Sequence, residues 1–443
     1  MKVYFVSLGC DKNLVDSEVM LGLLTDNGHT ITDDETEAEA IVINTCCFIH
    51  DAKEESVQCI IDLAQYKETG RLKRLVITGC LAERYADEIR SAMPEVDAVL
   101  GTNAIEDLPA ALSAEGFYVS KRAPEYLPLP DTKRVLAADS YSAPLKIAEG
   151  CDKHCTYCII PKIRGPYRSV PMERLLAEAR YLAEQGTKEL LIVAQETTVY
   201  GVDLYGYKAL PELLSKLCEI EGIAWIRLMY CYPEEITDEL IAVMKEEPKI
   251  CHYLDMPVQH ASDSILKRMG RRTTGRDIAK VVAKLRKAMK DITLRTTLIT
   301  GFPGETEEDA QTLVDFVTKL KFNRLGVFPY SKEEDTPAAR MKEQVPKRVK
   351  LSRRNRIMKL QREICAAYGK ANIGKRFMVM IDGFLPEENV YVGRTYMDAP
   401  GIDGSVYVES ARSLLSGSIV PVKITGANEY DLIGEMIEDE FAE

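Results

Sequence analysis

Two kinds of segment are missing from this chain of 443 residues. No apolar run approaches the length of a membrane span, which argues against an integral membrane protein. The N-terminus begins Met1-Lys-Val-Tyr-Phe, enters a strand pattern at once and has no signal-peptide layout. We therefore expect a cytoplasmic protein that does not associate with membranes, in which reduced thiols act as metal ligands or catalysts.

The composition argues against two further classes of protein. Twelve cysteines in an acidic chain of this length do not resemble a small disulfide scaffold. The net charge of −12 argues against bulk binding of nucleic acid. The length is sufficient for two to four domains with hydrophobic cores.

Cys151, Cys155 and Cys158 form a C-x3-C-x2-C run directly after residues 145–150. Three thiolates can hold three irons of a four-iron cubane and leave the fourth open, whereas closed clusters and zinc sites usually take four protein ligands. The alternatives are half of a zinc site or a chance cluster, but a second zinc-type pair at matching spacing is absent. Because open coordination positions are where metals perform chemistry, the run predicts a catalytic cluster.

The same spacing is the signature of radical S-adenosylmethionine enzymes. A free iron can chelate the amine and the carboxylate of S-adenosylmethionine. An electron from the cluster then cleaves the sulfonium and releases a 5′-deoxyadenosyl radical. Such a radical removes hydrogen from carbons that no general base could deprotonate.

The first hundred residues repeat a pattern of a short strand, a cysteine and a helix. The predicted strands are residues 3–6, 41–43 and 75–77, and the predicted helices are residues 16–26, 51–67 and 82–92. The cysteines after the strands are Cys10, Cys46 and Cys80. Loops that follow parallel strands meet at one edge of the sheet, so these thiols should converge into another triad. The alternatives are three buried structural cysteines, or Cys47 in place of Cys46.

The rest of the chain divides into an irregular linker, a barrel, a helix and a tail. The Pro-rich residues 118–144 are expected to be the linker. Six strand–helix units then predict an open, partial (β/α)6 barrel, with its site at the C-terminal ends of the strands. The predicted strands are residues 145–148, 189–193, 225–229, 253–257, 293–299 and 325–329. We thus expect an α/β protein with domains at 1–117, 145–340 and 372–443, and linking segments at 118–144 and 341–371.

Several residues at that end of the barrel are candidates to contact S-adenosylmethionine. Tyr157 is placed to pack near adenine, or only within its loop. Gln195 or Glu196 could bond the methionine amino group. Two glycines could bring the backbone close to a ligand, although a Gly-Pro turn would look the same. Arg295 could face the cofactor or pair inside the barrel. The candidates are Tyr157, Gln195, Glu196, Arg295, Gly301 and Gly304.

Residues 346–369 look like a basic helix, either a solvated linking helix or a contact for phosphate. Residues 372–443 read as short strands with Gly-rich turns, as in a small antiparallel β-barrel. This tail has 5 Lys/Arg and 13 Asp/Glu, hence a charge of −8, and carries most of the negative excess of the chain.

The whole chain resembles the methylthiotransferase branch of the radical S-adenosylmethionine enzymes. Gly9-Cys10, Asn44-Thr-Cys46 and Gly79-Cys80 match the auxiliary-cluster domain of that branch, and the tail resembles its TRAM domain. The chain is more similar to the ribosomal protein S-twelve methylthiotransferases than to the tRNA-modifying members. The segments that carry this likeness are residues 10–18, 149–152, 194–206, 253–260 and 394–404. It departs from many relatives at Glu196, where Asp is expected, and at Gly401, where Glu is common.

The resemblance implies that a methylthio group is attached to the β-carbon of one aspartate of ribosomal protein S-twelve, free or on the small subunit. It implies two 4Fe-4S clusters and S-adenosylmethionine as both methyl donor and radical source. The auxiliary cluster, held by Cys10, Cys46 and Cys80, would carry the inserted sulfur. It also implies an electron donor such as flavodoxin or ferredoxin.

Three further expectations concern partners and alternatives. An acidic tail should repel phosphate and attract a basic ribosomal protein, which makes tRNA an unlikely partner, unless the acidity serves only solubility. The nearest alternative function is a tRNA adenosine methylthiotransferase. An alternative of another class is a non-catalytic iron–sulfur scaffold or adaptor.

Overall fold

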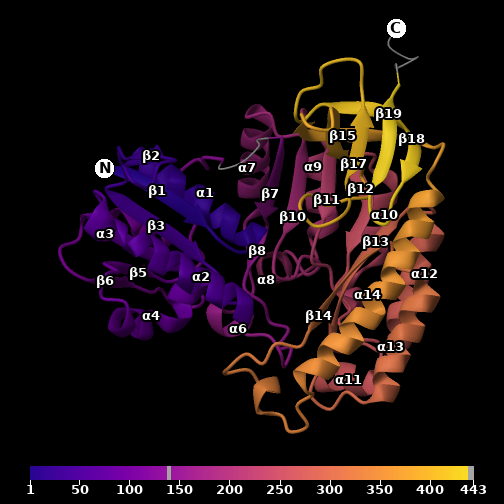
Figure 1. Cartoon of the computed structure of the whole chain (residues 1–443), viewed down its shortest axis with the longest axis horizontal. Helices are drawn as coiled ribbons and strands as arrows, with labels where there is room; N and C mark the ends of the chain where they lie inside the picture. The colour runs from indigo at the N-terminus through magenta and orange to yellow at the C-terminus, as the bar shows by residue number, and fades with distance from the viewer. Residues whose placement is uncertain (137–140, 438–443) are drawn as a thin grey trace.

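A computed structural model of the protein describes residues 1–136 and 141–437. Three bodies follow one another along the chain: an α/β layer at the N-terminus, a central curved sheet backed by helices, and a small barrel near the C-terminus (Figure 1). Together they confirm the predicted α/β class with a terminal β-barrel.

The N-terminal sheet contains six parallel strands in the order β2-β1-β3-β4-β5-β6. Its middle strands form because runs of Ile, Val and Leu are buried on both faces. The strands are β1 Lys2–Ser7, β2 Thr30–Thr32, β3 Ala40–Thr45, β4 Arg74–Gly79, β5 Ala98–Leu100 and β6 Tyr118–Ser120. The helices are α1 Asp11–Asp26, α2 His50–Ala64, α3 Tyr66–Thr69, α4 Cys80–Ala92, the 3-10 turn η1 Ile105–Asp107 and α5 Leu108–Ser113.

The predicted linker is wrong at both of its ends. Tyr118–Ser120 pairs with β5 as the last strand of the N-terminal sheet, and the central sheet already begins at β7, Ser142–Lys146. The prolines that suggested an irregular segment start only at Pro124, after β6 has ended. Part of the predicted linker, residues 137–140, lies outside the described residues.

The central sheet has six parallel strands in the open order β14-β13-β12-β11-β10-β7, which confirms the predicted partial barrel. Its other strands are β10 Glu189–Val193, β11 Trp225–Leu228, β12 Ile250–Asp255, β13 Thr293–Thr300 and β14 Arg324–Pro329. The first strand ends earlier than expected, at Lys146. Residues 148–149 instead form β8, Ala148–Glu149, which pairs antiparallel with β9, Arg168–Ser169, and so redirects the chain into the cysteine loop.

Helices cover the outer side of this sheet (Figure 1). Two of them, α12 and α13, are N-capped by Thr274 and Thr306, whose side chains accept hydrogen bonds from the backbone amides of Asp277 and Asp309. The helices are α6 Ile160–Ile163, α7 Met172–Glu184, α8 Val202–Tyr205, α9 Leu210–Cys218, α10 Asp238–Glu246, α11 Asp263–Arg268, α12 Gly275–Ala288 and α13 Glu307–Leu320, with the 3-10 turns η2 Pro233–Glu235 and η3 Ala338–Arg340.

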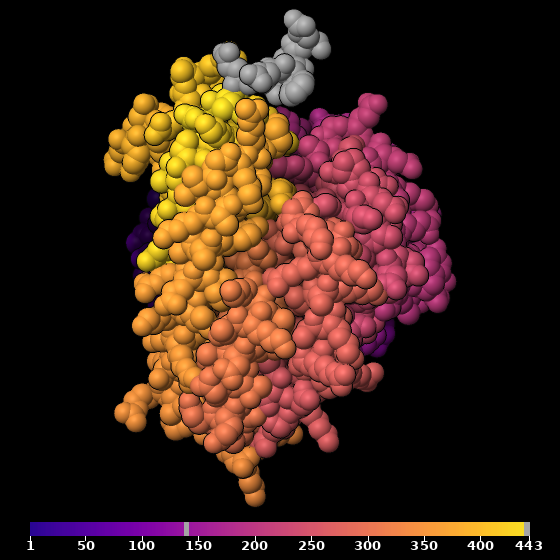
Figure 2. Space-filling view, turned by 90° about the vertical axis from the view of Figure 1, so that its right-hand side faces the viewer, coloured from indigo at the N-terminus to yellow at the C-terminus, as the bar shows by residue number. Residues whose placement is uncertain are grey.

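The basic helix is α14, Lys347–Lys370, and it packs along β14 and α13. Arg353 and Arg356 pair with Glu307, and Lys350 donates to the Tyr330 carbonyl oxygen. These contacts favour the linking role over the phosphate contact. Figure 2 shows α14 and the barrel as one continuous surface with the central body.

The tail folds into a closed barrel in the order β15-β16-β17-β19-β18. It is not wholly antiparallel, because β17 and β19 run parallel. The strands are β15 Arg376–Leu385, β16 Val390–Arg394, β17 Val406–Glu409, β18 Ile419–Ala427 and β19 Leu432–Met436.

Buried ion pairs and hydrogen bonds hold the C-terminal barrel against the central sheet. Glu189 of β10 is fully buried and accepts from Arg227 Nε at 2.8 Å, and Arg394 of the barrel pairs with the same carboxylate. Tyr253 donates to Asp403 at 2.7 Å. Removing one partner from such a buried group costs about 3–5 kcal/mol, so these contacts hold the two bodies in one arrangement. In residues 1–136 and 141–437, every helix is too short or too polar to traverse a lipid bilayer.

Candidate metal and cofactor site

Cys10, Cys46 and Cys80 converge at the C-terminal edge of the N-terminal sheet. Gly9 has φ of +97°, and a Cβ there would lie 2.9 Å from the Cys46 Cβ, so the Gly9-Cys10 turn passes directly over Cys46. Cys80 is the first residue of α4 and 6 % exposed. Burial raises the pKa of Cys80 to about 12, opposed by Arg164 and reinforced by Cys46, Cys47 and Cys10. Three thiols far apart in sequence therefore share one environment.

Cys46 fits this triad better than Cys47. Burial raises the pKa of Cys46, and its charged neighbours include Cys10 and Arg164. Cys47 is fully buried within the hydrophobic core, and the first charge that acts on its pKa is Arg84. Cys46 thus faces Cys10, whereas Cys47 lies toward Arg84.

Cys151, Cys155 and Cys158 lie in the loop after β8. The Cys151 sulfur accepts a hydrogen bond from the Lys153 amide at 3.4 Å, and the Cys155 sulfur is 3.5 Å from the Tyr232 hydroxyl oxygen. Burial raises the pKa of Cys151 to about 12 and also raises that of Cys158, whose thiol feels both Cys155 and Cys151. Cys151, Cys155 and Cys158 therefore form the second triad, in the loop that follows β8, and Cys10, Cys46 and Cys80 form the first triad.

Neither triad is arranged around a single metal ion. Within the two described ranges, no three His, Cys, Asp or Glu side chains meet at one point that could bind an ion. In a four-iron cubane each thiolate binds a different iron, so its ligands do not need to meet at one point. The donors of both sites, three cysteine thiols each, suit iron–sulfur ligation.

One arginine connects the two triads. Arg164 is 2 % exposed, and its Nη2 lies 3.6 Å from the Cys80 sulfur. Its Nη1 donates to Asp16 at 2.8 Å and to Glu149 at 3.1 Å. Glu149 lies two residues before Cys151. The guanidinium of Arg164 therefore contacts a cysteine of the first triad and a carboxylate next to the second triad.

Gln195 and Glu196 follow β10 at the same end of the sheet. Gln195 donates to Glu149 at 2.7 Å, and its buried Oε1 has no hydrogen-bond partner in the described part of the chain. Glu196 is 1 % exposed; its Oε1 accepts from the Thr198 amide at 3.0 Å, and its buried Oε2 has no hydrogen-bond partner within residues 1–136 and 141–437. Burial raises the pKa of Glu196 to about 7. Since Glu196 in turn raises the pKa of Cys151, its unpaired oxygen lies near the second triad, where an ammonium group would satisfy it.

The remaining candidates have partners within the chain. Tyr157 packs edge-on against Phe302 with ring centroids 6.5 Å apart. Arg295 pairs with Asp255 at 2.8 Å and with Asp403 at 3.4 Å, so it takes the internal pairing that was one of its two expected roles.

The two glycines make room for side chains of this protein. Gly301 and Gly304 have φ of +70° and +83°. A Cβ at Gly301 would overlap the Lys350 side chain, and one at Gly304 would overlap the Arg268 guanidinium. These contacts explain both glycines without a ligand, and a role in cofactor binding stays a prediction.

Sequence reasoning missed Arg164 and the pair Lys12–Tyr230. Lys12 Nζ lies 3.4 Å from the centre of the Tyr230 ring. Tyr230 follows β11 and has φ of +57°. Lys12 lies in the segment 10–18 that carried the family resemblance, which was the only available signal for it.

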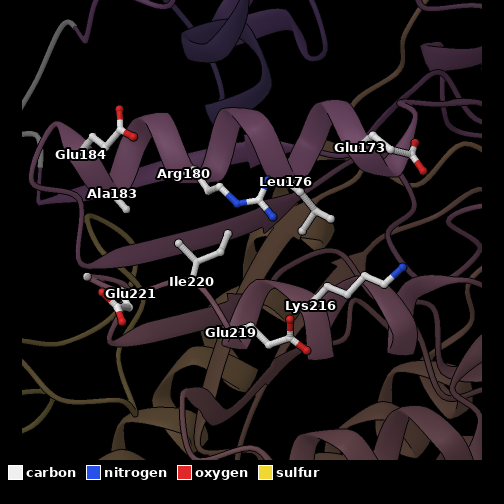
Figure 3. Close-up of a pocket in the computed structure, with 10 residues that line it drawn as sticks. Glu173, Leu176, Arg180, Ala183, Glu184, Lys216, Glu219, Ile220 and Glu221 are labelled. Carbon is white, nitrogen blue, oxygen red and sulfur yellow. The ribbon is translucent and has the colours of Figure 1, made fainter.

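A surface pocket lies elsewhere, between α7 and α9. Figure 3 shows Arg180, Leu176 and Glu173 of α7 on one side and Lys216 and Glu219 on the other. No cysteine lines it, so it is separate from both triads.

Comparison with known proteins places the chain. Residues 2–101 match the model described as "Uncharacterized protein family UPF0004", residues 145–317 the Radical SAM superfamily, and residues 373–437 the TRAM domain. The ribosomal protein uS12 methylthiotransferase RimO of Lachnoclostridium phytofermentans is 60 % identical over 98 % of this chain and 99 % of its own. The chain belongs to the RimO family. The RimO protein of Clostridioides difficile is 49 % identical over 99 % of both chains.

Solved structures support the fold alone. The radical S-adenosylmethionine methyltransferase TsrM from Kitasatospora setae aligns with a TM-score of 0.55 at 16 % identity, over 76 % of each chain. The cobalamin-dependent S-adenosylmethionine radical enzyme OxsB aligns with a TM-score of 0.52 at 13 % identity, over 82 % of this chain and 61 % of its own. The fold thus recurs in part at low sequence identity.

Proposed function

We propose that this member of the RimO family is a radical S-adenosylmethionine methylthiotransferase that modifies the β-carbon of an aspartate in ribosomal protein uS12. The observation that carries the proposal is identity of 60 % along the full chain to a protein of that name. Two cysteine triads in adjacent domains, with Arg164 between them, agree with it. A scaffold or adaptor would not need unpaired buried oxygens beside the second triad.

The six thiols fit two 4Fe-4S clusters, with Cys151, Cys155 and Cys158 on one and Cys10, Cys46 and Cys80 on the other. When bound, the cluster on Cys151, Cys155 and Cys158 would supply the electron that cleaves S-adenosylmethionine, and the cluster on Cys10, Cys46 and Cys80 would supply the sulfur. The protein has to hold these cysteines as thiolates in a buried place, so cluster binding releases protons. Arg164 favours the thiolate of Cys80 through its charge.

Glu196 and Gln195 are proposed to bind the methionine amino group of S-adenosylmethionine. Each has one buried oxygen without a hydrogen-bond partner among the residues described, and Glu196 lies close enough to Cys151 to raise the pKa of that thiol. An ammonium group placed there would pair with the carboxylate of Glu196 and restore its normal ionisation. Tyr157, Gly301 and Gly304 would contribute at the edge of the same site, next to Phe302.

The chemistry of the substrate explains why a radical reaction is needed. The β C–H of an aspartate lies beside a carboxylate anion and is too weakly acidic for a histidine or glutamate to remove. Hydrogen abstraction avoids that barrier. The shared Arg164 network keeps the two triads in neighbouring positions, which brings the sulfur source near the substrate carbon.

Partners follow from charge and chemistry. The acidic tail, including its barrel, suits a basic ribosomal protein, free or on the small subunit, better than tRNA. A cytoplasmic flavodoxin or ferredoxin is the kind of donor that would reduce the clusters. The substrate calls for a cytoplasmic location, since ribosomes assemble there.

Mass spectrometry of uS12 and of tRNA from cells lacking this protein tests the proposal. We expect uS12 to lack one methylthio group on an aspartate and to regain it when the wild-type gene returns, while tRNA is unchanged. A tRNA base that loses its methylthio group, with uS12 intact, would establish the tRNA alternative.

A further inference from the structure

Lys12 extends from the N-terminal domain to the C-terminal end of a strand of the central sheet. It lies in the first turn of α1, which starts directly after Cys10. Its Nζ stands 3.4 Å from the centre of the Tyr230 ring, just past the C-terminal end of β11. The residue is only 7 % exposed. In Figure 1, α1 lies between the two sheets, on the side of the N-terminal sheet that faces β7.

Among the described residues, no carboxylate forms an ion pair with Lys12; the groups that act on its charge are Tyr230, Cys10 and the neighbouring Asp11. Three other cations near the two triads form such pairs: Lys146 and Arg164 pair with Asp16 and Glu149, and Lys153 pairs with Glu235. A buried charge is costly unless it is paired. The Tyr230 ring offsets part of that cost, by about 1–2 kcal/mol. The protein therefore maintains an incompletely paired cation at this point.

This point lies between the two triads. On one side, Cys10 is two residues from Lys12 and is among the charges that act on it. On the other side, the Tyr230 carbonyl oxygen accepts a hydrogen bond from the Thr197 amide at 3.2 Å, next to Glu196. A substrate carbon that must be near both the S-adenosylmethionine site and the sulfur source has to enter this region.

We propose that Lys12 binds the side-chain carboxylate of the target aspartate and selects it. This inference rests on the proposed function and names the residue that recognises its substrate. The reacting β-carbon is bonded directly to the carboxylate carbon, so a cation that holds the carboxylate also fixes the carbon between the triads. An adenine ring carries no negative charge, so the same lysine disfavours a nucleobase at this position.

Equilibrium binding to uS12 tests the role of Lys12 without turnover. The cluster-loaded enzyme is titrated with uS12 and with uS12 whose target aspartate, located by the mass spectrometry above, is changed to asparagine. The enzymes are wild type, Lys12→Met and the control Lys280→Met, in which an exposed lysine of α12 is replaced. Methionine keeps the apolar stem over Tyr230 but removes the charge.

We expect wild type and Lys280→Met to bind the aspartate form at least tenfold more tightly than the asparagine form. Lys12→Met should bind both forms equally, at the wild-type affinity for the asparagine form. An unchanged preference in Lys12→Met, or no preference in wild type, overturns the assignment. If Lys12→Met does not retain its clusters, Lys12→Gln replaces it, and the same two results decide.

The inference and the proposed function fail in different ways. If wild type neither binds nor methylthiolates uS12, the substrate is wrong and the proposed function falls. If wild type methylthiolates uS12 and Lys12→Met keeps its preference for aspartate, only the role of Lys12 is refuted.

Discussion

The guanidinium of Arg164 lies 3.6 Å from the sulfur of Cys80. The two residues belong to different domains, and the same guanidinium pairs with Glu149 just before the second cysteine triad. A positive charge beside a thiolate that binds a cluster, as proposed for Cys80, stabilises the reduced, more negative cluster. Arg164 is thus placed to tune the first triad and to fix its position relative to the second.

Replacing Arg164 by methionine should lower the reduction potential of the auxiliary cluster. A hydrogen bond to a charged group contributes roughly 1.5–3 kcal/mol, which corresponds to about 60–130 mV for one electron. The measurement is a redox titration followed by EPR, in a background where Cys151, Cys155 and Cys158 are alanine. Arg164→Lys should keep part of the shift. An unchanged potential in Arg164→Met would show that the contact has no electronic effect.

The two triads should be separable by single substitutions. Cys155→Ala should abolish production of 5′-deoxyadenosine under reductant, because two thiolates hold a cubane poorly. Cys80→Ala should still cleave S-adenosylmethionine but should leave uS12 without a methylthio group. Chromatography of the nucleoside products and mass spectrometry of uS12 report the two steps. Equal loss of both products in the two variants would refute the division of roles.

Binding of S-adenosylmethionine should depend on the charge of Glu196. Burial raises its pKa to about 7, and the ammonium of the ligand needs the carboxylate form. Affinity should therefore rise as the pH increases from 6 to 8. Glu196→Gln should bind roughly tenfold more weakly, about 1.4 kcal/mol, with a flat profile over this range. Calorimetry of the cluster-loaded protein measures both, and a pH dependence that survives in Glu196→Gln would exclude Glu196 as its source.

Glu196 should also make the free energy of unfolding depend on pH. Its pKa is 4.5 in the unfolded chain and about 7 when folded, so the folded protein holds the extra proton between these values. The cluster-free protein should lose up to about 3 kcal/mol of unfolding free energy as the pH rises from 4.5 to 7. Urea unfolding of wild type and Glu196→Gln isolates the contribution of Glu196 to the free energy of unfolding, since the variant lacks the titrating group. Parallel curves would mean that Glu196 has an ordinary pKa.

Glu189 should be essential for holding the barrel in place. It is fully buried and binds Arg227 and Arg394, and these arginines lower its pKa although burial opposes them. Glu189→Gln should cost about 3–5 kcal/mol at pH 7, measured by urea unfolding. The effect should fade as the pH falls below 4.5 through the depressed folded pKa. The matched control is Glu212→Gln, an exposed partner of Lys216, which should cost at most about 0.5 kcal/mol.

The sequence predicted those parts of the fold that depend on local pattern. Buried apolar runs located the strands, and the geometry of a parallel sheet then predicted that Cys10, Cys46 and Cys80 converge. The start of α1 was missed by five residues, because Asp11, Lys12 and Asn13 carry no apolar periodicity. The helix begins there nonetheless, since Cys10 is extended and Asp11 favours the first turn.

The contacts between domains could not be predicted in this way. Arg164 meets Cys80 and Lys12 meets Tyr230 only after two separate sheets have docked. No spacing in the sequence records that docking. The same holds for Arg295, whose partner Asp403 comes from the barrel.

Iron and sulfide content after anaerobic reconstitution tests the central claim most directly. It is measured for wild type, for the variant with Cys10, Cys46 and Cys80 changed to alanine, and for the variant with Cys151, Cys155 and Cys158 changed to alanine. We expect about eight irons per chain in wild type and about four in each variant. About four irons in wild type, or a triple variant that retains all of its iron, would contradict it.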